Sequence, residues 1–130
     1  MRQFVGYIFL VVVLFHSCQK DGTKPCTEEE KTAAILTAFP DSLKAGEAYD
    51  VNIKYVLDNS CGSFDRFEIN STEKSFDVKL IAEYEGCNCN IEFSEHQVEF
   101  TIDVDYPGVY EYRFWQADND WDIRSITIYE

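Results

Sequence analysis

Apolar side chains fall at every second position in four stretches of this 130-residue sequence, and this alternation is the feature that most constrains the fold. The sets are mostly aromatic and β-branched: Tyr49, Val51, Ile53, Tyr55 and Leu57; Phe76, Val78, Leu80, Ala82 and Tyr84; His96, Val98, Phe100, Ile102 and Val104; Tyr110, Tyr112 and Phe114. Successive side chains of a strand point to opposite faces, so a period of two is typical of half-buried β-strands. No long stretch has helical spacing, and the pattern therefore predicts an all-β domain.

The alternation and the turn residues between the sets locate about seven strands. We expect them near residues 33–39, 49–57, 64–70, 75–84, 92–104, 109–115 and 122–129. Seven short antiparallel strands in about 100 residues favour an immunoglobulin-like β-sandwich. Ile123 and Ile126 have different parity, which predicts a bulge in the last strand. Thr27 followed by Glu30 fits a helix capping box, so we expect a short helical turn over 27–34.

A tyrosine near the turn at Pro107-Gly108 supports the sandwich prediction. Tyr110 stands where a tyrosine corner would lie, with its hydroxyl returning to the backbone of the turn. The alternative is a simple hairpin turn followed by a core tyrosine. Either role is structural.

The N-terminal residues have the features of an export signal. Residues 4–15 form an apolar run behind Arg2, and this run is shorter than the roughly 20 residues needed to span a bilayer. It ends at Leu14-Phe15-His16-Ser17-Cys18, which resembles a lipobox, the site where bacterial lipoprotein precursors are cut before a lipidated cysteine. Ser17 fits that pattern, whereas Phe15 and His16 depart from it. An uncleaved membrane anchor is the alternative.

This interpretation divides the chain into three parts. We expect a signal peptide at residues 1–17, a lipidated N-terminus and tether at 18–31, and the β-sandwich domain at 32–130. The acyl chains on Cys18, palmitate among them, would hold the protein to a membrane, because each buried methylene contributes about 0.8 kcal/mol.

Acidic residues dominate the charge of the chain. Removal of residues 1–17 takes away one of the 11 basic residues and none of the 24 acidic ones, which changes the formal net charge from −13 to −14. Phosphate backbones and anionic lipid surfaces would repel such a chain, so we expect no nucleic-acid partner. Solubility and mutual repulsion are the simplest consequence of the charge, and we expect a monomer.

Four cysteines remain once Cys18 is assigned to the lipid, and an exported chain normally pairs an even set. A Cys87–Cys89 bridge would close a very small ring, and we discount it. Two pairings stay open: Cys61–Cys87 with Cys26–Cys89, and Cys61–Cys89 with Cys26–Cys87. Alternate loops of an antiparallel run lie at the same end, so all four cysteines should gather at one end of the sandwich. The acidic loop at residues 118–122 should lie there too.

Metal binding is the alternative use of these cysteines. Thiolates of Cys61, Cys87 and Cys89 suit copper(I) or zinc, and His96 has inward parity and should lie near the same end. The set lacks the usual two-residue spacing within each cysteine pair, so disulfides are the favoured interpretation and we expect no cofactor. Asp118, Asp120 and Asp122 lack the glycine and the distal glutamate of the common calcium loop, which favours a solvated turn.

The sequence favours binding over catalysis. After removal of the signal, His96 is the one histidine, and no nucleophile-elbow or phosphate-loop motif occurs. Most aromatic residues belong to strand faces, but Trp115 has outward parity and Trp121 lies in an expected loop. These indoles, with Asp118 and Asp120, form the candidate binding surface. Edge packing of the two indoles is the structural alternative.

Three segments resemble a group of small immunoglobulin-like lipoproteins of Bacteroidota-type bacteria. They read "NSCGSF" (59–64), "AEYEGCNCN" (82–90) and "YPGVYEYRFW" (106–115), and the resemblance covers most of the chain from Ile35 on. It implies a lipid-anchored protein of the cell envelope at the outer membrane, facing the periplasm or the surface. We expect a non-catalytic binding module with a protein or glycan partner; the alternative is a protein that handles copper or zinc through thiolates.

Overall fold

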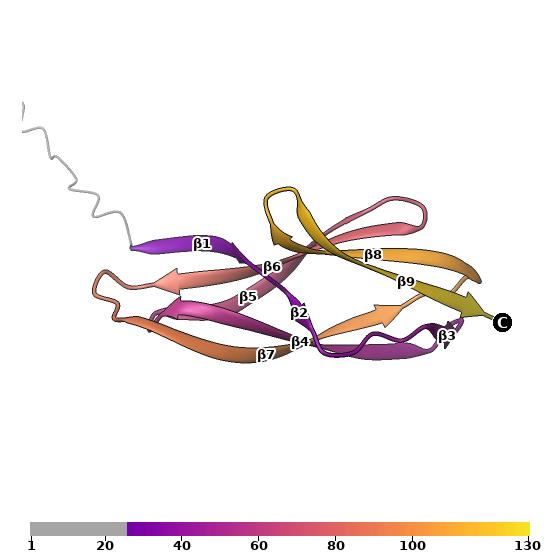
Figure 1. Ribbon diagram of the computed structural model, residues 1–130, viewed down its shortest axis with the longest axis horizontal. Coiled ribbons are helices and arrows are strands. Elements are labelled where there is room, and N and C mark those ends of the chain that lie inside the picture. Colours follow the sequence, from indigo (N-terminus) through magenta and orange to yellow (C-terminus); the bar gives the residue numbers. More distant parts are fainter. Residues whose placement is uncertain (1–25) are drawn as a thin grey trace, which may run out of the picture.

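The structure, a computed structural model, describes residues 26–130, which form nine strands in two sheets and no helix. The strands are β1 (Thr27–Thr32), β2 (Ile35–Leu36), β3 (Ser42–Lys44), β4 (Ala48–Asn59), β5 (Gly62–Ser71), β6 (Ser75–Glu85), β7 (Ile91–Asp103), β8 (Gly108–Ala117) and β9 (Asp120–Tyr129). The larger sheet has the order β1-β6-β8-β9-β3 with β5 also on β6, and the smaller has the order β2-β4-β7. The two sheets form an elongated sandwich (Figure 1). The predicted all-β sandwich is confirmed, and within residues 26–130 no helix of membrane-spanning length and apolarity occurs.

The core lies between the two inner faces and uses the alternating residues of the sequence. Ile53 and Ile102 of the smaller sheet and Phe114 of the larger sheet are fully buried. The rest of the buried cluster is apolar, and no polar or charged side chain of the described residues is buried. Burial of this apolar surface stabilises the sandwich, and the outward positions are left free for polar groups.

Strand β6 is the centre of the larger sheet, because three strands share its two edges. β5 pairs along one edge. The other edge is divided: β8 pairs in parallel with Ser75–Val78, and β1 pairs antiparallel with Leu80–Glu85. The β8–β9 hairpin therefore leaves β6 where β1 begins to pair, and it curls away from the sandwich at its tip (Figure 1).

The N-terminal part of the fold differs from the prediction. Residues 27–32 form strand β1 and no helical turn, and the strand expected at 33–39 is reduced to the two residues of β2, with the unpredicted β3 following at Ser42–Lys44. The domain starts before residue 32, since the last five residues of the expected tether belong to β1. The sequence hides this strand because "TEEEKT" has no apolar side chain. Its partners are tertiary: main-chain pairing with β6 and the Cys26–Cys87 disulfide.

An ion pair fastens β1 to β5 across the outer face. The two carboxylate oxygens of Glu29 lie 3.0 Å from the two terminal nitrogens of Arg66, in a bidentate pair. The hydrogen bond and the charge of Arg66 lower the pKa of Glu29. Because the ion pair is exposed, it adds little to the free energy of unfolding and mainly orients the Glu29 and Arg66 side chains.

The chain changes sheets directly after β1, at the buried Ala34. The backbone N–H of Ala34 donates to the carbonyl oxygen of Trp115 at 3.3 Å, and Nε2 of Gln116 donates to the carbonyl oxygen of Ala34 at 2.7 Å. The hydroxyl of Thr32 donates to the carbonyl oxygen of Val56 at 3.0 Å. These bonds satisfy the polar backbone groups of a segment that crosses between two sheets.

Two strand pairs are parallel, β3 with β9 and β6 with β8. Immunoglobulin domains are built from antiparallel sheets, so these pairs differ from the antiparallel run that we expected. The β-sandwich is established, and its immunoglobulin-like character remains a prediction.

The predicted bulge between Ile123 and Ile126 is absent. The β8–β9 register is continuous from Gly108↔Ile128 to Trp115↔Trp121, and it shifts only beyond Trp115, at the tip of the hairpin. The parity differs because Ile123 points outward and is 54% exposed, whereas Ile126 is buried. An exposed isoleucine produced the false signal.

The predicted tyrosine corner is confirmed. Tyr110 is buried, and its hydroxyl donates to the carbonyl oxygen of Tyr106 at 3.0 Å. The bond fixes the turn that leads into β8, as the corner does in sandwiches of related architecture.

Candidate functional site

Both predicted disulfides are present, and they lie together at one end of the sandwich. Of the two open pairings, the structure has Cys26–Cys87 and Cys61–Cys89, with Cα–Cα distances of 5.1 and 5.6 Å. The backbone N–H of Gly86 donates to the carbonyl oxygen of Cys26 at 2.7 Å, and that of Glu85 donates to Cys61 at 3.2 Å. The bridges therefore join the start of β1 and the β4–β5 turn to the loop after β6.

Gly86 is a structural requirement of this double bridge. Its φ is +140°, a region that favours glycine, and a Cβ atom there would lie 2.9 Å from Sγ of Cys61. A larger residue would strain the backbone and push against a half-cystine that cannot move freely.

The disulfides leave no thiolate at Cys61, Cys87 or Cys89 for copper or zinc in the oxidised protein. His96 keeps its inward parity but is exposed; Nε2 lies 2.8 Å from Oγ of Ser94, and its ring stacks on Tyr55 with centroids 5.6 Å apart. Within residues 26–130 no three His, Cys, Asp or Glu side chains are grouped so as to hold a metal ion. The thiolate ligand set therefore does not form in this state.

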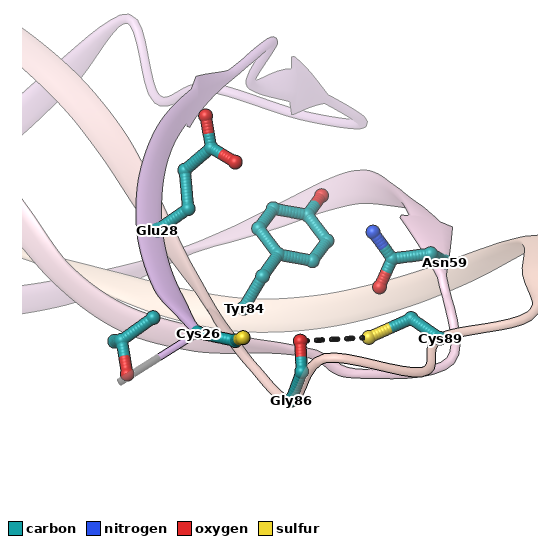
Figure 2. A pocket seen from close by; sticks show the side chains of 7 residues that line it. Cys26, Glu28, Asn59, Tyr84, Gly86 and Cys89 are labelled. Atoms are coloured by element: carbon teal, nitrogen blue, oxygen red, sulfur yellow. Dashed lines mark hydrogen bonds between the residues drawn. The ribbon is translucent and has the colours of Figure 1, made fainter. Parts of the chain in front are cut away.

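A pocket of about 470 Å³ opens at the disulfide end. Figure 2 shows the Tyr84 ring between Glu28 of β1 and Asn59 of β4, with Cys26, Gly86 and Cys89 along one side. Sγ of Cys89 lies 3.4 Å from the carbonyl oxygen of Gly86. A half-cystine has no hydrogen to donate, so this approach is a contact and not a hydrogen bond.

The Tyr84 ring is placed by a close backbone approach. A Cβ atom on Gly62 would lie 2.6 Å from Cε1 of Tyr84, so only glycine lets the ring lie flat on β5. Partial burial raises the pKa of the Tyr84 hydroxyl; the backbone of Asp58 lowers this pKa in part, and the carboxylates of Asp58 and Glu30 raise it. The sequence does not indicate this pocket, because the alternation places Tyr84 on a core face and Glu28 falls within the expected tether.

The two tryptophans of the candidate binding surface meet on the β8–β9 hairpin. Trp115 and Trp121 are direct cross-strand partners and are half-buried. Nζ of Lys31 lies over the Trp115 ring at 4.9 Å, and Cζ of Arg113 lies over the Trp121 ring at 5.1 Å, both measured to the ring centroid. We call these four residues the indole surface. Each cation–π contact contributes roughly 0.5–1 kcal/mol at an exposed site and orients the ring.

A carboxylate completes the stack on each indole. Asp118 pairs with Lys31 at 3.5 Å, and Asp77 pairs with Arg113 at 3.2 Å. The outer face thus carries two carboxylate–cation–indole stacks side by side. Trp115, Trp121 and Asp118 are residues of the predicted binding surface, whereas the two cations were not predicted. Lys31 comes from the unpredicted β1, and Arg113 is one outward residue among many.

The acidic loop does not lie at the disulfide end, contrary to the prediction. Its Asp118 pairs with Lys31, which stands opposite Ile81 in the β1–β6 register, well before Cys87. The shared edge of β6 explains the displacement, because β1 fills the place that a longer β8 would need. Asp120 is exposed at the tip.

Asp122 does not join Asp118 and Asp120 as an ion ligand. Its two carboxylate oxygens accept bonds from Nε and Nη2 of Arg124 at 2.7 and 3.0 Å. Asp118 and Asp120 are exposed, whereas Asp122 is half-buried within β9. Cys18 lies outside the described residues.

The fold and the two bridges define a disulfide-bonded, all-β, two-sheet domain of the β-sandwich class. The chain belongs to the ORF11 beta-sandwich domain family, whose model matches residues 51–128. The match begins within β4 and ends within β9, so β1, β2, β3 and Cys26 lie outside it. No curated protein and no solved structure matches the chain significantly.

Proposed function

We propose that this protein is a lipid-anchored component of a bacterial cell envelope whose domain acts as a non-catalytic binding module. The observation that carries the binding role is the indole surface on the outer face of the larger sheet. Tryptophan and arginine are enriched where binding energy concentrates. The rings are already held by Lys31 and Arg113, so a partner would lose less side-chain entropy in ordering them.

The anchor rests on the sequence around Cys18 and on its distance along the chain from the Cys26–Cys87 bridge. Cys26 follows Cys18 by eight residues, which reach at most about 28 Å when fully extended. A lipid on Cys18 would therefore keep the disulfide end close to the membrane. The formal net charge of −14 that remains after removal of residues 1–17 disfavours flat contact with anionic lipid, so the outer face would stay accessible.

Replacement of Cys18 by serine tests the anchor. Cells that express the wild-type chain should incorporate labelled palmitate into it, and the protein should sediment with membranes. The Cys18→Ser chain should carry no label, and any of it that is cut after the apolar run should leave the membrane fraction. Ser17→Ala, which keeps a small residue before Cys18, is the matched control and should behave like wild type. Incorporation of labelled palmitate into Cys18→Ser would refute the lipidation site.

Capture of envelope components tests the binding role of the indole surface. The full lipidated chain, purified in detergent and immobilised, should retain at least one component that Trp115→Ala/Trp121→Ala does not retain. The matched control is Ile91→Ala/Phe93→Ala, which removes two exposed apolar side chains, 88% and 75% exposed, on β7 of the other sheet. Identical retention by wild type and the double tryptophan variant would contradict the proposal.

A further inference from the structure

A second pocket lies at the end of the sandwich opposite the disulfides, beside the turn between β5 and β6. Its volume is about 410 Å³, and it is lined by Asn70, Ser71, Thr72, Ser75, Asp77 and Arg113. The lining contains an amide, three hydroxyls, a carboxylate and a guanidinium, with no apolar side chain among them. Such a lining offers donors and acceptors in nearly equal supply.

Three of these residues form a straight row across the outer face. Asn70 of β5 is the register partner of Asp77 of β6, which in turn is the partner of Arg113 of β8. Adjacent strands lie about 4.8 Å apart, so the row spans about 10 Å. Three planar polar groups at this spacing can bond successive hydroxyls of a ligand about two sugar rings long.

The row is held in place before any ligand arrives. The Asp77 and Arg113 side chains are only 31% and 34% exposed and pair at 3.2 Å. The backbone N–H of Thr72 donates to Ser75, and that of Glu111 donates to Lys74, both at 2.9 Å. These bonds fix the turn that carries three of the lining residues, and a preorganised site loses less entropy on binding.

Arg113 joins this pocket to the indole surface. Its guanidinium pairs with Asp77 in the pocket, and its Cζ lies 5.1 Å from the centroid of Trp121. Ile123 is the register partner of Arg113 on β9, and Trp121 lies two residues before it, so the Trp121 ring stands beside the row. An apolar face of a ligand can lie against the part of this ring that Arg113 does not cover. The polar row and the indole together match a ligand that has hydroxyls along its edges and C–H groups on its faces.

We infer that the binding partner at this surface is a neutral carbohydrate, seated on Asn70, Asp77 and Arg113 with one sugar ring against Trp121. The inference rests on the proposed binding function and names its ligand class. The one carboxylate and the one guanidinium of the lining neutralise each other, so the pocket itself favours an uncharged ligand. The acidic chain as a whole repels an anionic ligand. A protein partner would instead need an apolar centre, which this pocket lacks.

The two tryptophans of the chain make the test specific, because both belong to the indole surface. Trp115→Phe leaves Trp121 as the one indole, and Trp121→Phe leaves Trp115. The full chain in detergent is titrated with a galactomannan, a xyloglucan, an α-mannan and a mixed-linkage β-glucan, with polygalacturonate as the anionic comparison. At least one neutral polysaccharide should change the emission of Trp115→Phe and retard its migration in a native gel.

A matched pair of double variants locates the site. Asp77→Ala/Arg113→Ala removes both charges together, so that neither is left unpaired, and should weaken polysaccharide binding at least tenfold. Asn52→Ala/Gln97→Ala removes a hydrogen-bonded amide pair on the smaller sheet and should leave binding unchanged. Urea denaturation of each variant is the control for folding: a cooperative transition like that of the wild type is expected.

Three results would overturn the inference. Binding that survives Asp77→Ala/Arg113→Ala would place the ligand elsewhere, and binding of polygalacturonate alone would exclude a neutral ligand. The absence of binding to every neutral polysaccharide would remove carbohydrate as the partner. In that last case, capture of an envelope component that still depends on Trp115 and Trp121 would leave the proposed binding function standing. If neither polysaccharide binding nor tryptophan-dependent capture is observed, the proposed binding function is contradicted as well.

Discussion

Replacement of both Cys26 and Cys87 by serine is expected to lower the free energy of unfolding by about 4 kcal/mol, because the bond restricts a long loop of the unfolded chain. The two cysteines are 61 residues apart in the sequence. Urea denaturation followed by tryptophan fluorescence measures the change. The loss should appear as a lower midpoint, and reductant, which breaks both disulfides, should lower the midpoint of the wild-type protein further.

The second disulfide is the control for this prediction. Cys61 and Cys89 are 28 residues apart, so the same chain-entropy argument gives a smaller loss of about 3.5 kcal/mol for Cys61→Ser/Cys89→Ser. Equal stability of wild type and Cys26→Ser/Cys87→Ser would contradict the prediction, and so would a clearly larger loss for the shorter loop.

Phe114→Ala is expected to cost about 3–5 kcal/mol, the range for removal of a large aromatic ring from a packed core. Phe114 is fully buried, and its ring centroid lies 5.6 Å from that of Phe100 and 6.1 Å from that of Phe39. The cavity would lie between the two sheets, where few side chains can move in to fill it. Thermal and urea unfolding of the purified variant give the change.

Phe93→Ala is the matched substitution on the surface. Phe93 is 75% exposed on β7, so the change in stability should stay within about 0.5 kcal/mol. A loss at Phe93 as large as that at Phe114 would mean that Phe93 is covered in the native protein and that the β7 face is not free.

The strands with alternating apolar residues were predictable, since burial of one face imposes the period of two. β4, β6, β7 and β8 lie where this pattern placed them, and the tyrosine corner follows from Tyr110 and the turn before it. β1 was not predictable in this way. Its Glu and Lys side chains carry no apolar period, and the strand exists because β6 offers a free edge and Cys87 a covalent partner.

The candidate site shows the same division between local and long-range information. Trp115 and Trp121 stand out in the sequence as indoles away from the core pattern. Lys31 and Asp77, which complete the stacks, come from distant strands, and no local pattern indicates that they meet the hairpin. The pairing of the four cysteines is long-range too, and the sequence left two arrangements equally open.

The Cys26–Cys87 bond also determines how the domain bears tension. A pull on the chain ahead of Cys26 enters the fold at that residue and passes through the bond to the loop after β6. The load then reaches β6, which hydrogen-bonds to strands on both edges, and it bypasses the six polar residues of β1. The disulfide end is therefore a covalently cross-linked point of attachment. A force on the outer face can be carried through it without separating β1 from β6.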